Sequence, residues 1–288
     1  MIEETLRGLA ATRATDPDAI ARAARKRRRS EGLPQRLMLI AADHPARGAF
    51  GVGNRPAAMA DRAGLLDRLL VALSRPGVHG VLGTPDVIED LLLLGALDGK
   101  VVIGSMNRGG IPGTVFEIDD RFTAYDAATI AAMGFDGGKM LLRIDPAAPA
   151  TADTLAGCAR AVSELADRQI MAMVEPFWVA HRDGKSGNDL SADAMMRAIA
   201  IGQALGRTSA YTWLKVPVVA QMERVMAAST LPALLLGGDP AGRPEETYAT
   251  WQAALRLPNV RGLVIGRTLL YPQDDDVATA VDTAVGLL

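Results

Sequence analysis

Short apolar runs alternate with amphipathic stretches from residue 36 to the C-terminus. The runs are almost continuously apolar, which is typical of parallel strands covered on both faces. They predict strands at 36–43, 78–82, 100–105, 137–143, 169–177, 211–217, 233–237 and 260–265. The intervening pattern predicts helices at 56–74, 84–94, 126–133, 151–168, 191–206, 220–228, 244–256 and 274–288. Strand–helix units repeated over about 250 residues favour an α/β fold of the closed (β/α)₈ TIM-barrel type.

A doubly wound sheet is the alternative for such a pattern, and it often has a glycine fingerprint after its first strand. The turn here reads Asp43-His-Pro-Ala-Arg-Gly48, so no dinucleotide site is indicated. No composition break divides the chain, and we predict one barrel domain over 1–288, with 1–35 as an N-terminal helical extension. Asp16 and Pro17 are the expected N-cap and N1 pair within that extension, which covers one end of the barrel or a subunit contact.

The charge of the chain bears on whether it binds nucleic acid. The formal net charge is −2, and the basic run Arg25–Arg29 is short and predicted to be a solvated helix face. We therefore expect no nucleic-acid partner. The single cysteine, Cys158, suits a reducing cytoplasm, and neither a signal peptide nor a membrane-spanning apolar run is present in the sequence. The apolar extension and the Ala-rich final helix favour a homo-oligomer.

Four ionisable residues stand near the carboxyl ends of predicted strands, where barrel enzymes place their active sites. They are Asp43, Lys139, Glu175 and Lys215. Lysine in an apolar pocket has a lowered pKa, and two neighbouring ammonium groups lower each other's pKa. A neutral amine is the nucleophile of Schiff-base chemistry, and a nearby carboxylate transfers protons. A buried structural ion pair, Lys139–Glu175, is the alternative, but placement at four strand ends favours catalysis.

The ends of the last two strands predict an anion site. Gly237 and Gly238 follow the seventh strand, and Gly266 and Arg267 follow the eighth, where barrels commonly bind phosphate. Glycines that merely turn the chain are the alternative. The further candidate substrate-binding residues at the barrel mouth are His44, Arg47 and Arg143. The three histidines show no metal-ligand spacing, so no metal site is predicted.

Six strings in order resemble the class I (Schiff-base) aldolase superfamily, in particular its tagatose-bisphosphate and sulfofructose-phosphate aldolase branch. The strings are Asp43-His44, Thr123-Ala-Tyr-Asp126, Gly138-Lys-Met-Leu-Leu142, Val174-Glu-Pro176, Leu214-Lys-Val-Pro217 and Gly262-Leu-Val-Ile-Gly-Arg267. The string Asn107-Arg-Gly-Gly-Ile-Pro-Gly-Thr114 is similar to an actinobacterial subgroup linked to inositol catabolism.

The resemblance implies that Lys215 forms the imine, Glu175 is the acid/base, Lys139 sets the pocket electrostatics and Asp43 orients substrate hydroxyls. It implies that Gly238, Gly266 and Arg267 bind the phosphate of a dihydroxyacetone-phosphate half. It also implies that no cofactor is needed, because the protonated imine is the electron sink. The inositol link implies 5-dehydro-2-deoxy-phosphogluconate as the substrate and malonate semialdehyde as the aldehyde product.

Two predicted loops, 107–121 after the third strand and 178–187 after the fifth, match no motif of that family. They leave the aldehyde product open, with a second anion (phosphate, sulfonate or carboxylate) expected at Arg47, Arg108, Arg121 or Arg182. A sugar-phosphate isomerase or epimerase without an imine and a non-catalytic sugar-phosphate sensor are the competing interpretations.

Overall fold

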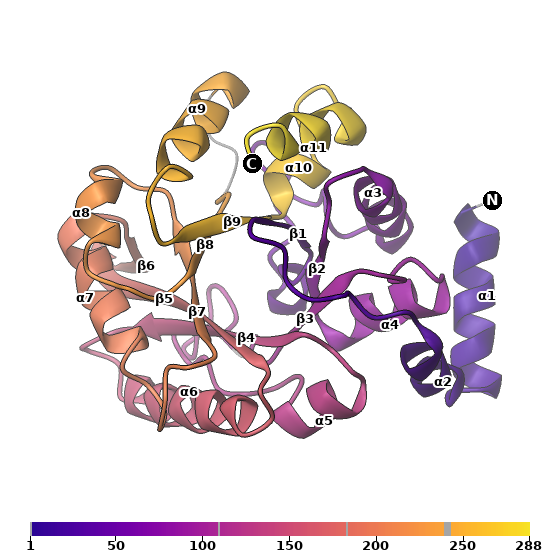
Figure 1. The fold of residues 1–288 in the computed structure, drawn as a ribbon, viewed down its shortest axis with the longest axis horizontal. Coiled ribbons are helices and arrows are strands. Elements are labelled where there is room, and N and C mark those ends of the chain that lie inside the picture. The colour runs from indigo at the N-terminus through magenta and orange to yellow at the C-terminus, as the bar shows by residue number, and fades with distance from the viewer. Residues whose placement is uncertain (1, 109, 183, 239–242) are drawn as a thin grey trace.

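The computed structural model describes residues 2–108, 110–182, 184–238 and 243–288 of the 288-residue chain. Parallel pairing runs β4-β3-β2-β1-β9-β8-β7-β5, and an additional β4–β5 pairing closes this order into an eight-stranded barrel. The strands are β1 (Leu37–Ala41), β2 (Gly80–Gly83), β3 (Val101–Ser105), β4 (Gly137–Ile144), β5 (Met171–Arg182), β7 (Thr212–Pro217), β8 (Ala233–Leu236) and β9 (Val260–Ile265). The predicted (β/α)₈ barrel is confirmed (Figure 1).

Helices surround the barrel (Figure 1). They are α3 (Arg62–Ser74), α4 (Pro85–Leu93), α5 (Ala127–Ala132), α6 (Ala150–Ala166), α7 (Ala192–Gly202), α8 (Met222–Met226), α9 (Pro244–Ala254), α10 (Arg267–Leu270) and α11 (Val277–Val285), with a 3₁₀ turn, η1 (Pro45–Arg47), after β1. None of the described helices is both long enough and apolar enough to cross a membrane.

Alternate residues of each strand enter two separate apolar layers, as the period-two geometry of a strand requires. The barrel interior is filled by side chains such as Leu39, Ile103, Met173 and Leu234. Their strand neighbours, including Ile40, pack outward against the helices. Because both faces are buried, the strands read as continuous apolar runs in the sequence.

The N-terminal extension forms α1 (Ile2–Thr15) and α2 (Ala19–Lys26), which lie beside α4 (Figure 1). Arg27, buried at the end of α2, donates to the Lys100 carbonyl at 3.1 Å and the Gly134 carbonyl at 2.7 Å. Those two residues lie just before β3 and β4, so the extension is fastened to the amino-terminal end of the barrel. Its predicted cap is displaced: Asp18, not Asp16, precedes α2, because the Asp16 carbonyl accepts from Ala19 in the turn between the helices.

Several further element boundaries differ from the prediction, and two of them are helix starts set by a capping side chain. Helix α3 begins at Arg62 instead of residue 56, because the Asp61 side chain accepts hydrogen bonds from the Ala63 and Gly64 N–H groups and caps it there. The last predicted helix begins at Val277, where Asp276 accepts from the Thr279 N–H.

The predicted loop at 178–187 is in fact a β-hairpin. Strand β5 continues to Arg182 and pairs antiparallel with β6 (Lys185–Asp189), from Trp178 opposite Asp189 onward. Two residues of the loops that matched no motif, Gly109 and Asp183, lie outside the described residues.

Candidate active site

Strand register brings the predicted catalytic residues together inside the carboxyl end of the barrel. Lys139 on β4 lies opposite Met173 on β5, and Met173 lies opposite Trp213 on β7. Glu175 and Lys215 are each two residues further along their strands, so both point to the same interior face one layer nearer the mouth.

These side chains form a connected network of ion pairs. Glu175 Oε1 lies 2.9 Å from Lys215 Nζ, and Glu175 Oε2 contacts Lys139 Nζ. Lys139 Nζ also donates to Asp43 Oδ2 at 3.1 Å, and Arg108 NH1 lies 3.3 Å from the same oxygen. Every member is buried, from Lys139 at 0% exposed to Glu175 and Arg108 at 7%. Each carboxylate therefore contacts two basic side chains. The network contains three basic groups (Lys139, Lys215 and Arg108) and two acidic ones (Asp43 and Glu175).

The pKa values of the acids follow from this arrangement. Burial opposes ionisation of Glu175, but Lys139 and Lys215 outweigh it and lower the pKa of Glu175 to about 2. Burial likewise opposes ionisation of Asp43, and Arg108 and Lys139 nevertheless hold its pKa well below the ordinary value. Both carboxylates are consequently ionised at neutral pH.

The pKa of Lys139 is lowered, although two carboxylates lie beside it. Burial lowers the Lys139 pKa more than Asp43 and Glu175 raise it, and the neighbouring Lys215 lowers it further. Burial also lowers the pKa of His44 to about 3, so its imidazole is neutral at physiological pH. The site thus combines ionised acids with a neutral histidine.

A pocket of about 290 Å³ lies directly above Glu175 and Lys215. It is lined by Ala41, His44, Arg47, Arg108, Leu141, Arg143, Glu175, Phe177, Asn188, Leu190, Lys215, Pro217, Leu236, Gly237, Gly238, Val264, Gly266 and Arg267. Asp43 and Lys139 are not part of this lining. This volume is close to the lower limit of ordinary ligand pockets, about 300 Å³. It suits a small ligand such as a phosphorylated sugar.

The four residues of the predicted anion site line one side of this pocket, at the ends of β8 and β9. Gly238 has φ +67°, a left-handed conformation that glycine adopts without strain. A Cβ at Gly266 would meet the Ala41 carbonyl oxygen at 2.5 Å, so only glycine fits there. Arg267 NH1 donates to the Gly51 carbonyl at 3.4 Å. Both constraints come from the backbone itself, so phosphate binding by these glycines stays a prediction that rests on their place in the pocket lining.

Of the arginines expected to bind a second anion, Arg47 and Arg108 line the pocket. Arg47 Nε donates to the Gly110 carbonyl at 2.9 Å, and burial, followed by Arg143 and Arg108, lowers the Arg47 pKa to about 10. Arg121 and Arg182 are exposed and lie outside the pocket lining, with Arg121 paired to Asp119.

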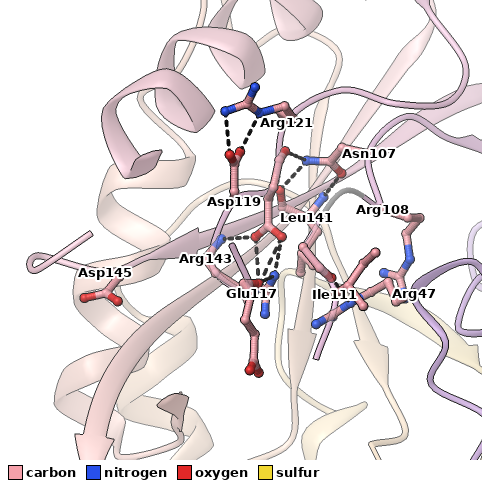
Figure 2. Close-up of polar contacts among 12 residues, drawn as sticks. Arg47, Asn107, Arg108, Ile111, Glu117, Asp119, Arg121, Leu141, Arg143 and Asp145 are labelled. Atoms are coloured by element: carbon pink, nitrogen blue, oxygen red, sulfur yellow. Dashed lines mark hydrogen bonds and ion pairs between the residues drawn. The ribbon is translucent and has the colours of Figure 1, made fainter. Parts of the chain in front are cut away.

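Arg143, predicted to bind substrate, lines the pocket but is mainly engaged by the loop after β3. Its Nε donates to Asp120 Oδ2 at 2.8 Å, its NH2 to Asp120 Oδ1 at 2.5 Å, and NH2 also contacts the Glu117 carbonyl. Figure 2 shows the guanidinium of Arg143 directed at this loop. These contacts indicate that the main role of Arg143 is to hold the loop after β3 in place.

Sequence reasoning missed the residues that shape the rim of the pocket. Asn188 and Leu190 come from the hairpin and the residues after it, and Phe177 lies on β5 opposite Arg143 of β4. The Asp-Gly pair at 183–184 is a common hairpin signal and was available in the sequence. Asn107 and Asp120, which hold the loop after β3, had no such signal, because each acts through partners distant in the sequence.

Among the described residues, no three His, Cys, Asp or Glu side chains gather in an arrangement that would hold a metal ion.

Comparison with known proteins places the chain in a family. A crystal structure of Cgl0159 from Corynebacterium glutamicum is 52% identical, with a TM-score of 0.95 over 99% of this chain and 96% of that chain. A Schiff-base-forming fructose-1,6-bisphosphate aldolase and an archaeal fructose-1,6-bisphosphate aldolase are 19% and 18% identical. Both have TM-scores of 0.64 over 88% of this chain, and over 94% and 93% of their own lengths. At that identity they share the fold alone.

No curated protein matches the chain. The sequence model of the family described as Cgl0159-like matches residues 35–285, which include every strand of the barrel and every residue of the network. The chain therefore belongs to the Cgl0159-like family.

Proposed function

We propose that the protein is a class I aldolase that cleaves a ketose phosphate through an imine on Lys215. The observation that carries the proposal is the contact of 2.9 Å between Lys215 Nζ and Glu175 Oε1 at the floor of the pocket. An amine nucleophile beside an ionised carboxylate, in a buried site, is the pair that imine chemistry needs. The barrel is also the fold of a Schiff-base-forming fructose-1,6-bisphosphate aldolase, which makes the reaction class consistent with the scaffold.

The reaction begins with the ketone. The Glu175 carboxylate accepts a proton from the Lys215 ammonium, and the neutral amine adds to the carbonyl carbon to form a carbinolamine. Protonated Glu175 then returns a proton to the departing hydroxyl, water leaves, and a protonated imine remains. The low pKa of Glu175 keeps it ionised in the free enzyme, and its contact of 2.9 Å with Lys215 Nζ gives the proton a direct path for the first of these transfers.

Carbon–carbon cleavage uses the same groups. Glu175 accepts the proton of the hydroxyl on the carbon that becomes the aldehyde, the adjacent carbon–carbon bond breaks, and its electron pair moves to the imine nitrogen. The products are an aldehyde and an enamine. Protonation of the enamine carbon and hydrolysis of the imine release dihydroxyacetone phosphate and regenerate Lys215. Lys139, between Glu175 and Asp43, provides positive charge beside both acids throughout.

Asp43 is proposed to orient the substrate hydroxyls. Its Oδ2 is held by Lys139 and Arg108, whereas its buried Oδ1 has no hydrogen-bond partner within the described part of the chain. His44 Nδ1 lies 3.8 Å from Oδ1 and is likewise buried without a partner among the described residues. Buried polar atoms are normally satisfied, so we propose that a substrate hydroxyl hydrogen-bonds to both atoms.

The substrate we favour is 5-dehydro-2-deoxy-phosphogluconate, with Gly237, Gly238, Gly266 and Arg267 at its phosphate and Arg47 at its carboxylate. Cleavage then gives dihydroxyacetone phosphate and malonate semialdehyde. The sequence resemblance to an inositol-catabolism subgroup and a basic pocket wall away from the phosphate side support this choice. Sulfofructose phosphate and tagatose or fructose bisphosphate are the alternatives, since each also has a second anionic group.

Trapping with borohydride tests the proposal. Incubation with dihydroxyacetone phosphate and borohydride should add one covalent mass, which peptide mapping places on Lys215. Lys100→Met is the matched control, because Lys100 lies at the opposite end of the barrel, where its Nζ donates to the Val78 carbonyl at 2.7 Å. Unchanged ketose-phosphate turnover by Lys215→Met would favour an isomerase or epimerase instead.

A panel of ketose phosphates, scored for release of dihydroxyacetone phosphate, separates an aldolase from a sugar-phosphate sensor. The sensor is stabilised against heat by a ligand and cleaves none of the panel. A cytoplasmic location and a homo-oligomer remain predictions. Cell fractionation and light scattering of the purified protein test them.

A further inference from the structure

Three buried polar residues join the loop after β3 to the end of β4. Asn107 Nδ2 donates to the Asp120 carbonyl and to the Leu141 carbonyl, both at 2.7 Å, and its Oδ1 accepts from the Leu141 N–H at 2.6 Å. Asp120 accepts from Arg143 through both carboxylate oxygens and from the Arg143 backbone N–H at 3.2 Å. We call Asn107, Asp120 and Arg143 the clasp; Figure 2 labels Asn107 and Arg143.

Holding a loop with the clasp carries a desolvation penalty, because its polar groups are buried. Asn107 is 0%, Asp120 1% and Arg143 4% exposed, so two charges and an amide are fully withdrawn from water. Ordinary loops remain on the surface, where their polar groups are solvated. A buried ion pair contributes little net stability compared with apolar packing, so its value here is geometric: it fixes both ends of the segment 107–120 against one strand.

Two pocket arginines depend on this segment. Arg108 follows Asn107 directly, and its NH1 lies 3.3 Å from Asp43 Oδ2. Gly110 supplies the carbonyl that accepts from Arg47 Nε at 2.9 Å. Gly110 is also pressed against the clasp, since a Cβ there would meet Arg143 NH2 at 2.1 Å. Any shift of the clasp therefore moves Arg108 and removes the partner of Arg47.

The segment lies across the barrel from the predicted phosphate site. In the circular strand order, β3 is opposite β8 and β4 is opposite β9. A ligand with its phosphate at Gly237 and Gly266 and its ketone at Lys215 extends toward the ends of β3 and β4. The group that meets Arg47 and Arg108 is then the part of the substrate that leaves as the aldehyde.

We propose that Asn107, Asp120 and Arg143 are positioning residues that set the recognition of the aldehyde half of the substrate. The proposal rests on the proposed aldolase function for the orientation of the ligand. It assigns Arg143 a role through Arg47 and Arg108, in place of direct phosphate binding. None of the described hydrogen bonds of the clasp reaches Lys215 or the predicted phosphate residues, which lie on β7 and at the ends of β8 and β9.

The test uses two variants that perturb the clasp differently. Asp120→Asn keeps the shape and removes the charge. Gly110→Ala keeps every charge and every strand residue and displaces the loop, so it remains informative if Asp120→Asn folds poorly. Asp119→Asn is the control, because Asp119 pairs with exposed Arg121 in the same loop, apart from Arg47 and Arg108 in Figure 2.

Calorimetry measures the Kd of dihydroxyacetone phosphate and of a full-length probe. The probe is the tightest-binding of 5-dehydro-2-deoxy-phosphogluconate, tagatose bisphosphate and fructose bisphosphate. Both clasp variants should raise the Kd of the full-length probe about 10-fold or more and leave that of dihydroxyacetone phosphate within about twofold. Equal changes for the two ligands, or none for either, overturn the proposal.

Borohydride trapping on the wild-type protein separates this result from the proposed reaction. Binding that follows the expected pattern without a Lys215 adduct rejects the aldolase and supports the clasp. An adduct on Lys215 with no selective loss of full-length binding in the variants supports the aldolase and rejects the clasp.

Discussion

Lys215 Nζ lies 2.9 Å from Glu175 Oε1, and the two side chains come from strands that pair with each other in the barrel. Glu175 divides its carboxylate between two lysines, one on each neighbouring strand. The carboxylate that we propose as proton acceptor is therefore positioned by three neighbouring strands of the barrel.

Replacing this acceptor tests its role directly. Glu175→Gln is expected to lower kcat by about 10²–10⁴-fold, because proton transfer to and from the substrate loses its carrier. Steady-state kinetics with the best ketose phosphate of the panel measures the effect. Glu223→Gln is the matched control, since Glu223 is an exposed residue of α8. A Glu175→Gln variant within twofold of wild type would contradict the assignment.

The same residue makes stability depend on pH. The Glu175 pKa falls from an ordinary 4.5 to about 2 on folding, so its contribution is present above pH 4.5 and is lost as the pH falls toward 2. Wild type should thus exceed Glu175→Gln in unfolding free energy at neutral pH, and the difference should shrink through that window.

Urea denaturation at pH 7, 5, 4 and 3 measures this. A difference that stays constant over the series would show that Glu175 has an ordinary pKa in the folded protein.

Phosphate recognition is expected to depend on Arg267. Arg267→Met should weaken binding of dihydroxyacetone phosphate by about 10- to 100-fold, the loss of a hydrogen bond to a charged group. Inorganic phosphate should lose its inhibition in parallel. Arg261→Met is the control, because Arg261 is exposed at the start of the same strand, β9. Equal affinities of the two variants for dihydroxyacetone phosphate would place the phosphate elsewhere.

The N-terminal extension should affect stability without affecting the site. Arg27→Met removes two hydrogen bonds to carbonyls at the amino-terminal end of the barrel and leaves those acceptors without their donor. We expect a loss of about 1–3 kcal/mol in the free energy of unfolding. Chemical denaturation measures that loss, and an unchanged KM confirms that the effect is confined to the far end. A raised KM with normal stability would instead connect the extension to the pocket.

The fold was predictable because covered parallel strands leave a strong record in sequence. Every barrel strand was found from its apolar run, and Lys139, Glu175 and Lys215 were recognised because a charge inside such a run is costly and needs an explanation. Helix starts were less accurate. The start of α3 depends on Asp61, and several turn-forming residues precede it.

The rim of the pocket was not predictable for a different reason. Asp120 and Arg143 are 23 positions apart, and Arg47 meets Gly110 across 63. Nothing in either neighbourhood distinguishes a buried ion pair from two solvated charges. Such contacts form only when the barrel closes. Asp120 meets Arg143, for example, because β3 pairs with β4.

The circular order of strands has an evolutionary consequence. The lysines and Glu175 occupy β4, β5 and β7, whereas the clasped segment 107–120 follows β3. With the proposed role of the clasp, changes in that segment other than at Arg108 should alter which substrates bind while the lysines and Glu175 stay in place. Divergence of substrate range within this family should accordingly concentrate between residues 107 and 120, with the three strands retained.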